Sequence, residues 1–332
     1  MGLMRGYLNV LLPSAEVVVA TSLVAEPGQE HSETLEALGA RLAKEVNTYI
    51  LRFCPLLALQ GVLSSSPQGP SSSLGSNGHY GQGGGVAAAA DEQAGGRRGW
   101  FGRAREQPVV GTAVAVEERK QGRLSFVCFS MGGLVVRYAL QQAVLAPFAS
   151  RLHCYVSLAC PHLGQASSPS IVKTGTWALR KVTGSKILHE LDLQDASDPL
   201  STTLYRQSRA GGLERFRSVV LVSNPQDGLV AVHSALVQVR PPQELDTSAN
   251  AAAAAMARNL LDKMDETRTR VVRVLVDYEH QAKGTLDSMI GRAGHLCFID
   301  SPQVAWVLAL TLLPMMQEER LTSPVSAIAH GE

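Results

Sequence analysis

The stretch Leu124-Ser-Phe-Val-Cys-Phe-Ser130-Met-Gly-Gly133-Leu-Val-Val-Arg-Tyr-Ala-Leu140 contains an apolar run that stops at a serine, two glycines, and a second apolar segment with helical periodicity. This order is typical of a buried strand, a sharp turn and a helix that begins at the glycines. Such a turn lifts the serine hydroxyl above the sheet, and the first amides of the helix point toward the same place. Glycines suit the turn because the backbone folds back without a Cβ clash. We therefore predict a nucleophile elbow with Ser130 at its tip.

The usual form of this motif is Gly-x-Ser-x-Gly. Gly132 matches its last glycine, whereas Cys128 stands where the first glycine is expected. Cysteine is small and apolar, so it is among the less damaging replacements at a position where helix and strand pack closely. We expect the elbow to survive this change.

The charge balance of the chain argues against a nucleic-acid partner. The sequence has 30 Lys and Arg against 29 Asp and Glu, which gives a formal net charge of +1. It contains no run of like charge, whereas nucleic-acid-binding proteins typically carry a basic patch or stripe. With 332 residues, 45% of them hydrophobic, the chain is long enough to bury a sizeable core in one or two domains.

The cysteines and the apolar stretches indicate a cytoplasmic protein. The five cysteines are odd in number and lie mostly in apolar runs, which favours reduced, buried thiols over a disulfide framework. The longest apolar stretch, near residues 304–313, is too short for a transmembrane helix. The first residues lack the pattern of a secretory signal peptide. We expect no transmembrane segment.

Strands and helices are predicted to alternate along the chain. Residues 16–22 have the composition of a buried strand and residues 32–54 the periodicity of a helix, and we expect Pro147 to end the helix that follows the elbow. Further strands are predicted over 153–160, 218–224 and 271–278, and further helices within 185–193 and 246–270 and from Ser301-Pro302 onward. This alternation predicts a parallel, doubly wound sheet of the α/β class, with helices on both faces.

Ser130 needs a general base within hydrogen-bond distance, and that base needs a third group to orient it. Asp227 follows an apolar strand in Asn224-Pro-Gln-Asp-Gly228, although an Asp in this setting also commonly caps a turn. His295 lies in a predicted glycine-bearing loop, Gly291-Arg-Ala-Gly-His-Leu296. The order Ser, Asp, His is that of an α/β-hydrolase. His162 and His233 are the alternative candidates for the base.

The chain resembles the serine esterase, or lipase-like, domain at the C-terminal end of eukaryotic proteins named "family with sequence similarity 135". The resemblance rests on segments that occur in order along nearly the whole chain: Tyr7-Leu-Asn-Val-Leu-Leu-Pro13, Ser157-Leu-Ala-Cys-Pro-His-Leu-Gly164, Thr174-Gly-Thr-Trp177, Pro225-Gln-Asp-Gly-Leu-Val-Ala-Val-His-Ser-Ala235 and Gly291-Arg-Ala-Gly-His-Leu-Cys-Phe-Ile-Asp-Ser301. It implies an α/β-hydrolase fold with nucleophile Ser130, acid Asp227 and base His295. It also implies a lipid or other hydrophobic carboxylic ester as substrate. No cofactor is predicted.

The resemblance suggests how the chain is organised into domains. Residues 1–60 are expected to form the N-terminal part of the hydrolase domain and residues 108–320 the remainder, with a helical cap at about 165–217. Residues 61–107 are rich in Ser, Gly, Pro and Ala, which predicts a disordered insertion. Residues 321–332 are expected to be a tail.

One departure from the family bears on activity. The family's strand and histidine-glycine loop upstream of the segment around Tyr7 have no counterpart here, and that loop normally supplies one amide of the oxyanion hole. The other amide is that of the residue after the nucleophile, here Met131. Losing one donor costs about 3–4 kcal/mol of transition-state stabilisation in a known hydrolase. We expect the chain to be truncated; direct pairing of residues 17–22 with the elbow strand, or substitution by residues 109–116, are the alternatives.

The sequence thus predicts a serine esterase that acts through an acyl-enzyme on a small-molecule ester or lipid. An inactive hydrolase-fold scaffold or lipid-binding protein is the alternative, because of the missing oxyanion loop. An acyltransferase with the same triad differs only in its acceptor. No metal site is predicted, because the histidines and cysteines lack short ligand spacings.

Overall fold

The structure, a computed structural model, describes residues 1–21, 32–54, 122–165, 185–244, 247–277 and 291–317. The internal contacts of the chain define one unit of residues 1–64 and 122–332 and a second of residues 65–121, so every described residue belongs to the first unit. The predicted insertion at 61–107, the alternative strand at 109–116, the tail at 321–332 and much of the first half of the predicted cap lie outside the described residues.

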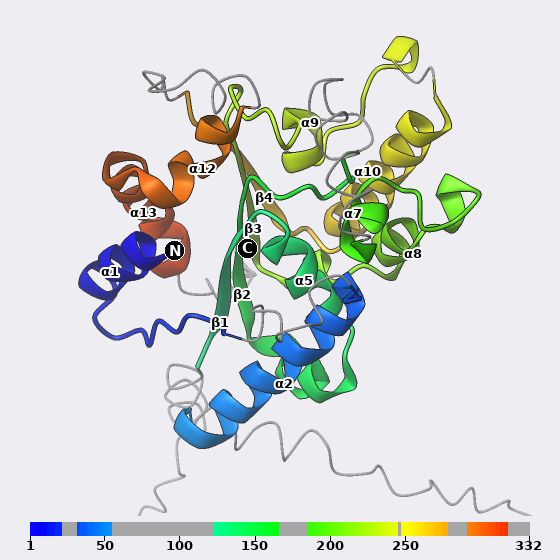
Figure 1. Cartoon of the computed structure of the whole chain (residues 1–332). Coiled ribbons are helices and arrows are strands. Elements are labelled where there is room, and N and C mark those ends of the chain that lie inside the picture. Colours follow the sequence, from blue (N-terminus) through cyan, green and yellow to red (C-terminus); the bar gives the residue numbers. More distant parts are fainter. Residues whose placement is uncertain (22–31, 55–121, 166–184, 245–246, 278–290, 318–332) are drawn as a thin grey trace, which may run out of the picture. The chain divides into compact units, whose positions relative to one another are not determined.

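The described part of the chain contains one four-stranded parallel sheet (Figure 1). Its strands are β1 (Leu124–Phe129), β2 (Leu152–Leu158), β3 (Ser218–Ser223) and β4 (Arg270–Leu275), and their order in space is their order in sequence. Every residue of β2 and β3 is buried, whereas β1 and β4 are only partly buried. This is the α/β architecture with a parallel sheet that the alternation of strands and helices predicted.

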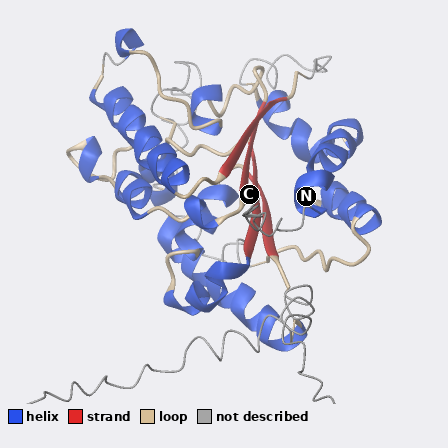
Figure 2. Cartoon of the chain, turned by 180° about the vertical axis from the view of Figure 1, so that it is seen from behind, coloured by secondary structure: helices blue, strands red, loops and turns tan. Residues whose placement is uncertain are grey.

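Side chains of the inner strands alternate between two hydrophobic cores, one on each face of the sheet. Tyr155 and Leu221 belong to the first core, and their neighbours Val156 and Val222 to the second. The first core is completed by α2 (Leu35–Phe53), α5 (Gly132–Ala139), α7 (Lys186–Leu191), α8 (Thr203–Ala210) and α10 (Ser248–Glu266). The second is completed by α1 (Gly2–Leu11), α12 (Arg292–Asp300) and α13 (Pro302–Gln317) (Figures 1 and 2). The sheet is therefore covered on both faces, as predicted.

Shorter helices connect these elements. They are α9 (Val232–Ala235) and the 3-10 helices η1 (Ala143–Arg151), η2 (Pro199–Ser201), η3 (Leu213–Arg215) and η4 (Pro242–Glu244). Within the described ranges no single helix is long and apolar enough to cross a membrane; α12 and α13 pass that test only as a pair, and they are bent by 65°.

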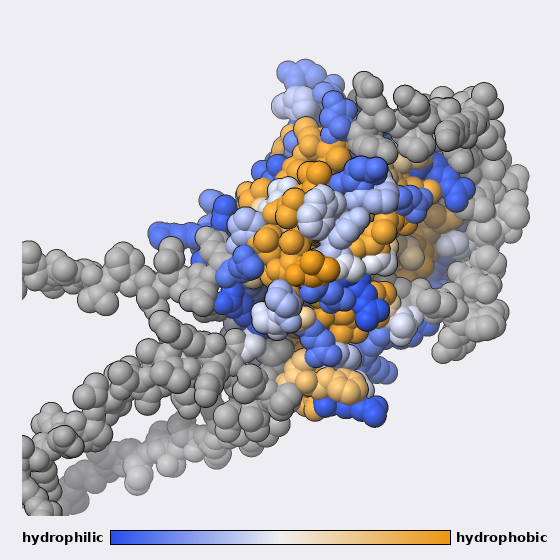
Figure 3. All heavy atoms as spheres, turned by 90° about the vertical axis from the view of Figure 1, so that its left-hand side faces the viewer, coloured by the Kyte–Doolittle hydropathy of each residue, from blue (hydrophilic) through white to orange (hydrophobic). Residues whose placement is uncertain are grey.

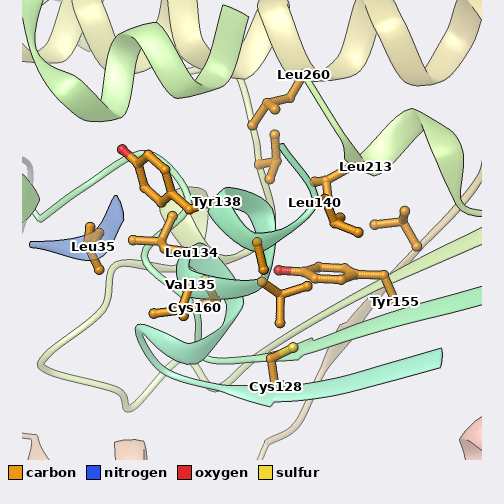
Figure 4. Close-up of a cluster of buried hydrophobic side chains, with 14 of the residues drawn as sticks. Leu35, Cys128, Leu134, Val135, Tyr138, Leu140, Tyr155, Cys160, Leu213 and Leu260 are labelled. Atoms are coloured by element: carbon orange, nitrogen blue, oxygen red, sulfur yellow. The ribbon is translucent and has the colours of Figure 1, made fainter. Parts of the chain in front are cut away.

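The first core is centred on α5, which packs between α2 and the sheet (Figure 4). Leu134 and Tyr138 of α5 meet Leu35 of α2 on one side, and Tyr155 and Cys128 approach from the strands. The helix α2, predicted from residue 32, begins at Leu35, where the Thr34 side chain accepts a hydrogen bond from the Ala37 amide at 3.1 Å. The tight packing fixes the helix that follows the elbow against the sheet.

The buried strand predicted over residues 16–22 is wrong for the described residues 16–21. This segment belongs to no helix or strand, and Val18 and Val19 are exposed. The Thr21 amide donates instead to the carboxylate of Glu45 on α2, at 2.8 Å. The expected alternative of direct pairing with the elbow strand is therefore wrong as well. Composition could not show this, because a valine run fits an exposed extended segment and a buried strand equally well.

Pro147 does not end the elbow helix, contrary to the prediction. The helix α5 ends at Ala139, where the amides of Gln141 and Gln142 bond to the carbonyls three residues earlier. Pro147 lies further on, inside η1. The other predicted strands and helices within the described residues are present, and the Ser301 hydroxyl caps α13 by accepting from the Val304 amide at 3.3 Å.

Gly39 marks the closest approach of α2 to α5, and its replacement by alanine is expected to destabilise the protein. A Cβ at this position would lie 2.4 Å from Cβ of Tyr138. We expect Gly39→Ala to lower the free energy of unfolding by about 1–3 kcal/mol through overpacking. Gly6→Ala in α1, where nothing lies within 4 Å of the added Cβ, should instead be neutral or stabilising by up to about 1 kcal/mol. Urea denaturation measures both, and equal effects would contradict the packing argument.

Glu190 is buried on α7, and it accepts a hydrogen bond from the Leu35 amide at 2.8 Å. Burial raises the pKa of this carboxyl from 4.5 to about 7. Because the folded state holds the proton more tightly than the unfolded state, the contribution of Glu190 to stability is largest below about pH 4.5 and is lost as the pH rises toward 7. Glu190→Gln should remove this slope from urea midpoints measured across that range, whereas Glu266→Gln, at an exposed position on α10, should retain it.

Candidate active site

Ser130 occupies a sharp turn between β1 and α5, as the elbow prediction requires. Its φ angle is +53°, in the left-handed region that residues other than glycine rarely adopt. Its amide donates to the carbonyl of Leu158 at 2.9 Å, which fixes the turn to the end of β2. The side chain is partly exposed. The backbone thus holds the Ser130 hydroxyl at the carboxyl end of the sheet, where solvent can reach it.

The glycine at position 133, in the first turn of α5, is required because there is no room for a side chain. A Cβ at Gly133 would lie 2.6 Å from Sγ of Cys160 and 2.7 Å from the hydroxyl of Tyr155. The Tyr155 hydroxyl also donates to the Gly133 carbonyl at 2.9 Å. Cys128 packs into the same core, where burial raises the pKa of its thiol well above its ordinary value and keeps the thiol neutral. The cysteine in place of the first glycine is therefore accommodated as a small apolar side chain.

The side chains of Ser130, His295 and Asp227 meet in a hydrogen-bonded row. Nε2 of His295 lies 3.0 Å from Oγ of Ser130, and Nδ1 lies 2.8 Å from Oδ2 of Asp227. The imidazole and the carboxylate are both buried, and the ring of Phe129 lies 4.9 Å from the imidazole ring. His295 thus lies within hydrogen-bond distance of both a serine 165 positions away and an aspartate 68 positions away.

Asp227 is held by backbone amides. Its Oδ1 accepts hydrogen bonds from Leu229 at 2.8 Å and from Val230 at 2.9 Å, which leaves Oδ2 for His295. The carboxylate therefore caps a turn and faces the imidazole at the same time. The sequence left open whether Asp227 caps a turn or orients a histidine, and in the structure its carboxylate makes both sets of hydrogen bonds.

His295 lies on a helix and not in the predicted loop. The helix α12 begins directly after Gly291, whose φ of +64° turns the chain into it. Gly291 and Gly294 both face the loop that carries Asp227: a Cβ at Gly291 would lie 2.2 Å from Cα of Gly228, and one at Gly294 would lie 2.5 Å from the carbonyl oxygen of Gln226. The two glycines let the first turn of α12 approach this loop closely.

Asn224 connects the same two segments, and sequence reasoning missed its role. Its Nδ2 donates to the carbonyl of Gly294 at 3.2 Å, and its Oδ1 accepts from the Gln226 amide at 2.8 Å. Gly294 directly precedes His295, and Gln226 directly precedes Asp227. The signal was present in the motif Asn224-Pro-Gln-Asp-Gly228, where a buried Asn before a turn indicates local backbone bonding.

The alternative histidines do not reach Ser130. His162 is fully buried, its Nε2 lies 3.0 Å from Oγ of Ser157, and burial lowers its pKa well below the ordinary value. His233 lies on α9, where burial also lowers its pKa. Across the described ranges, His295 is the histidine within hydrogen-bond distance of the Ser130 hydroxyl.

Met131 and Gly132 place two backbone amides beside Ser130 at the start of α5. Among the described residues, none accepts a hydrogen bond from the Met131 amide. Amides at a helix N-terminus favour negative charge, so this position suits a developing oxyanion. Within the part of the chain that the structure describes, no group of three or more His, Cys, Asp or Glu side chains could hold a metal ion.

Comparison with known proteins agrees with this geometry. Residues 107–241 match the family described as "Putative serine esterase (DUF676)", which supports a serine esterase domain with an α/β-hydrolase-like fold in this chain. The matched residues include Ser130 and Asp227, and His295 lies beyond them. The narrower resemblance to the "family with sequence similarity 135" proteins is not confirmed. No solved structure matches the chain.

Asn224→Asp is expected to weaken the site, because the carboxylate keeps the acceptor for the Gln226 amide and loses the donor to Gly294. The carboxylate oxygen that replaces Nδ2 then faces the Gly294 carbonyl, which keeps its bond from the Cys297 thiol at 3.1 Å, and two opposed buried acceptors cost about 1–3 kcal/mol of folding free energy. We also expect at least a tenfold slower reaction of Ser130 with a fluorophosphonate, since about 1 Å of misplacement costs on the order of a hundredfold in rate. The control is Asn259→Asp, which removes the donor to the Ser208 hydroxyl on the other face of the sheet. Equal rates for the two variants would contradict a positioning role for Asn224.

Proposed function

We propose that this chain is a serine hydrolase that cleaves carboxylic esters through an acyl-enzyme, with nucleophile Ser130, base His295 and acid Asp227. The observation that carries the proposal is the row of hydrogen bonds from Ser130 through His295 to Asp227, at 3.0 and 2.8 Å. The match of residues 107–241 to a serine esterase family supports the same reaction class. The strained backbone of Ser130 is further support, because unusual dihedral angles cluster at functional sites.

The reaction begins when His295 takes the proton of the Ser130 hydroxyl at Nε2 while Oγ attacks the ester carbonyl. Asp227 holds the imidazole in the tautomer with the proton on Nδ1 and stabilises the imidazolium that forms. The Met131 amide donates to the tetrahedral oxyanion. His295 then returns the proton to the leaving alcohol, and the acyl-enzyme is hydrolysed by water that His295 activates in the same way.

The proposed substrate is a lipid or another ester with a hydrophobic acyl group. Apolar side chains adjoin the reacting atoms: Phe129 contacts the imidazole, and the partly exposed Met131 follows the nucleophile. We also propose that the protein works in the reducing environment of the cytoplasm. All five cysteines are unpaired and four of them are buried, which supports this location.

The proposal predicts labelling of Ser130 by a fluorophosphonate. The native chain should react and Ser130→Ala should not. Asp227→Asn should slow the reaction by roughly 10³–10⁴-fold, as the corresponding change does in a serine protease, because the imidazole then adopts the wrong tautomer. Mass spectrometry of the adduct measures both the rate and the position of labelling.

His233→Gln is the matched control, since it removes a histidine that is part of the resemblance but does not reach Ser130. It should react as fast as the native chain, whereas His295→Gln should lose almost all reactivity. A folded native chain that stays unlabelled would refute the hydrolase and favour the inactive scaffold.

A further inference from the structure

The two helical layers of the structure differ sharply in charge. The helices α1, α12 and α13 together have 35 residues, of which three carry charge: Arg5, Arg292 and Asp300. On the opposite face of the sheet, ten of the 38 residues in α2 and α10 are charged. A helix that covers a sheet in water normally has a polar outer face, as α2 and α10 do. The outer surface of the layer formed by α1, α12 and α13 does not follow this rule.

Apolar side chains are exposed on this layer. On α13, Trp306 is 39% exposed, Val307 60% and Leu310 43%, and on α1 Val10 is 73% exposed. The rings of Tyr7 and Trp306 meet edge to face with their centroids 5.1 Å apart, so the exposed rows of the two helices adjoin there. We refer to Tyr7, Val10, Trp306, Val307 and Leu310 as the apolar face. Figure 3 views the molecule from this side and shows hydrophobic residues gathered in patches on it.

The apolar face offers little to a partner that binds through directed polar contacts. None of the 16 residues of α13 is charged. The exposed hydroxyl of Thr311 donates to the carbonyl of Val307, one turn earlier on the same helix, at 2.8 Å. The one charge on α1 is that of Arg5, which lies two positions before Tyr7 and so points away from it around the helix. What the apolar face provides is aliphatic area and a Trp-Tyr pair.

We propose that the apolar face docks on the surface of a lipid membrane. Aliphatic side chains gain free energy by leaving water for the acyl region, in proportion to the area buried. Trp and Tyr rings favour the boundary between headgroups and acyl chains, because one end of each ring system is apolar and the other is polar.

This surface is joined to the site through the chain itself. The helix α13 begins at Pro302, two residues after the end of α12, and α12 carries His295. A membrane that holds the apolar face therefore lies near the helix that supplies the proposed base. The idea that the membrane also supplies the ester substrate rests on the proposed function. The docking proposal does not depend on it.

The test is co-sedimentation with vesicles of phosphatidylcholine and phosphatidylserine, using the Ser130→Ala chain so that no hydrolysis alters the lipid. We expect this chain to sediment with the vesicles. Val307→Ser together with Leu310→Ser should weaken binding by at least roughly tenfold, from the apolar area removed. The control pair is Leu51→Ser and Leu200→Ser, at positions that are 55% and 48% exposed and belong to elements on the other side of the sheet. This pair should bind as before.

Three results would overturn the proposal: no sedimentation of the parent chain, equal losses in both pairs of variants, or a dimer in solution that only the Val307 and Leu310 changes dissociate. The last result would show that a second copy of the chain covers the apolar face. Labelling of Ser130 is measured separately in the native background. Vesicle binding without labelling would refute the hydrolase alone, and labelling without vesicle binding would refute the docking alone.

Discussion

The contact between the first turn of α12 and the loop after β3 is the constraint on which the site depends. Gly291 and Gly294 approach the backbone of residues 226–228 so closely that neither position has room for a Cβ. The amide of Gly228 donates to the carbonyl of Gly291 at 3.2 Å, and Asn224 bridges the same segments. This contact sets the distance between the carboxylate and the imidazole, because Asp227 lies within the loop and His295 directly follows Gly294.

The parallel sheet supplies the other half of the arrangement. The carboxyl ends of parallel strands lie at one edge, so the turn after β1 and the loop after β3 are neighbours across β2. The strained turn at Ser130 is tied to β2 through the Leu158 carbonyl, and Tyr155 of β2 secures the first turn of α5. Burial of β2 and β3 on both faces makes this edge rigid. A rigid edge lets side chains from three distant segments converge without a metal ion or disulfide among the described residues.

The sequence predicted what depends on local pattern. Ser130, Asp227 and His295 were each singled out from short motifs, and the strands around them from apolar runs, because turn chemistry and hydrophobic periodicity are local properties. It failed where tertiary contacts decide. Residues 16–21 have the composition of a strand but no partner in the sheet. His295 lies in the first turn of a helix because Gly291, which has a positive φ and no Cβ, fits against Gly228. The bridging role of Asn224 also depends on two segments about 70 positions apart.

The most direct test of the account is the proton NMR spectrum of the native chain in the far-downfield region. A proton held between Nδ1 of His295 and the Asp227 carboxylate should give a resonance there, shielded from exchange by the burial of both groups. We predict that this resonance is present in the native chain and absent from the folded His295→Gln and Asp227→Asn variants. A folded native chain without it, or a resonance that persists in His295→Gln, would contradict the central claim that these side chains form one hydrogen-bonded row.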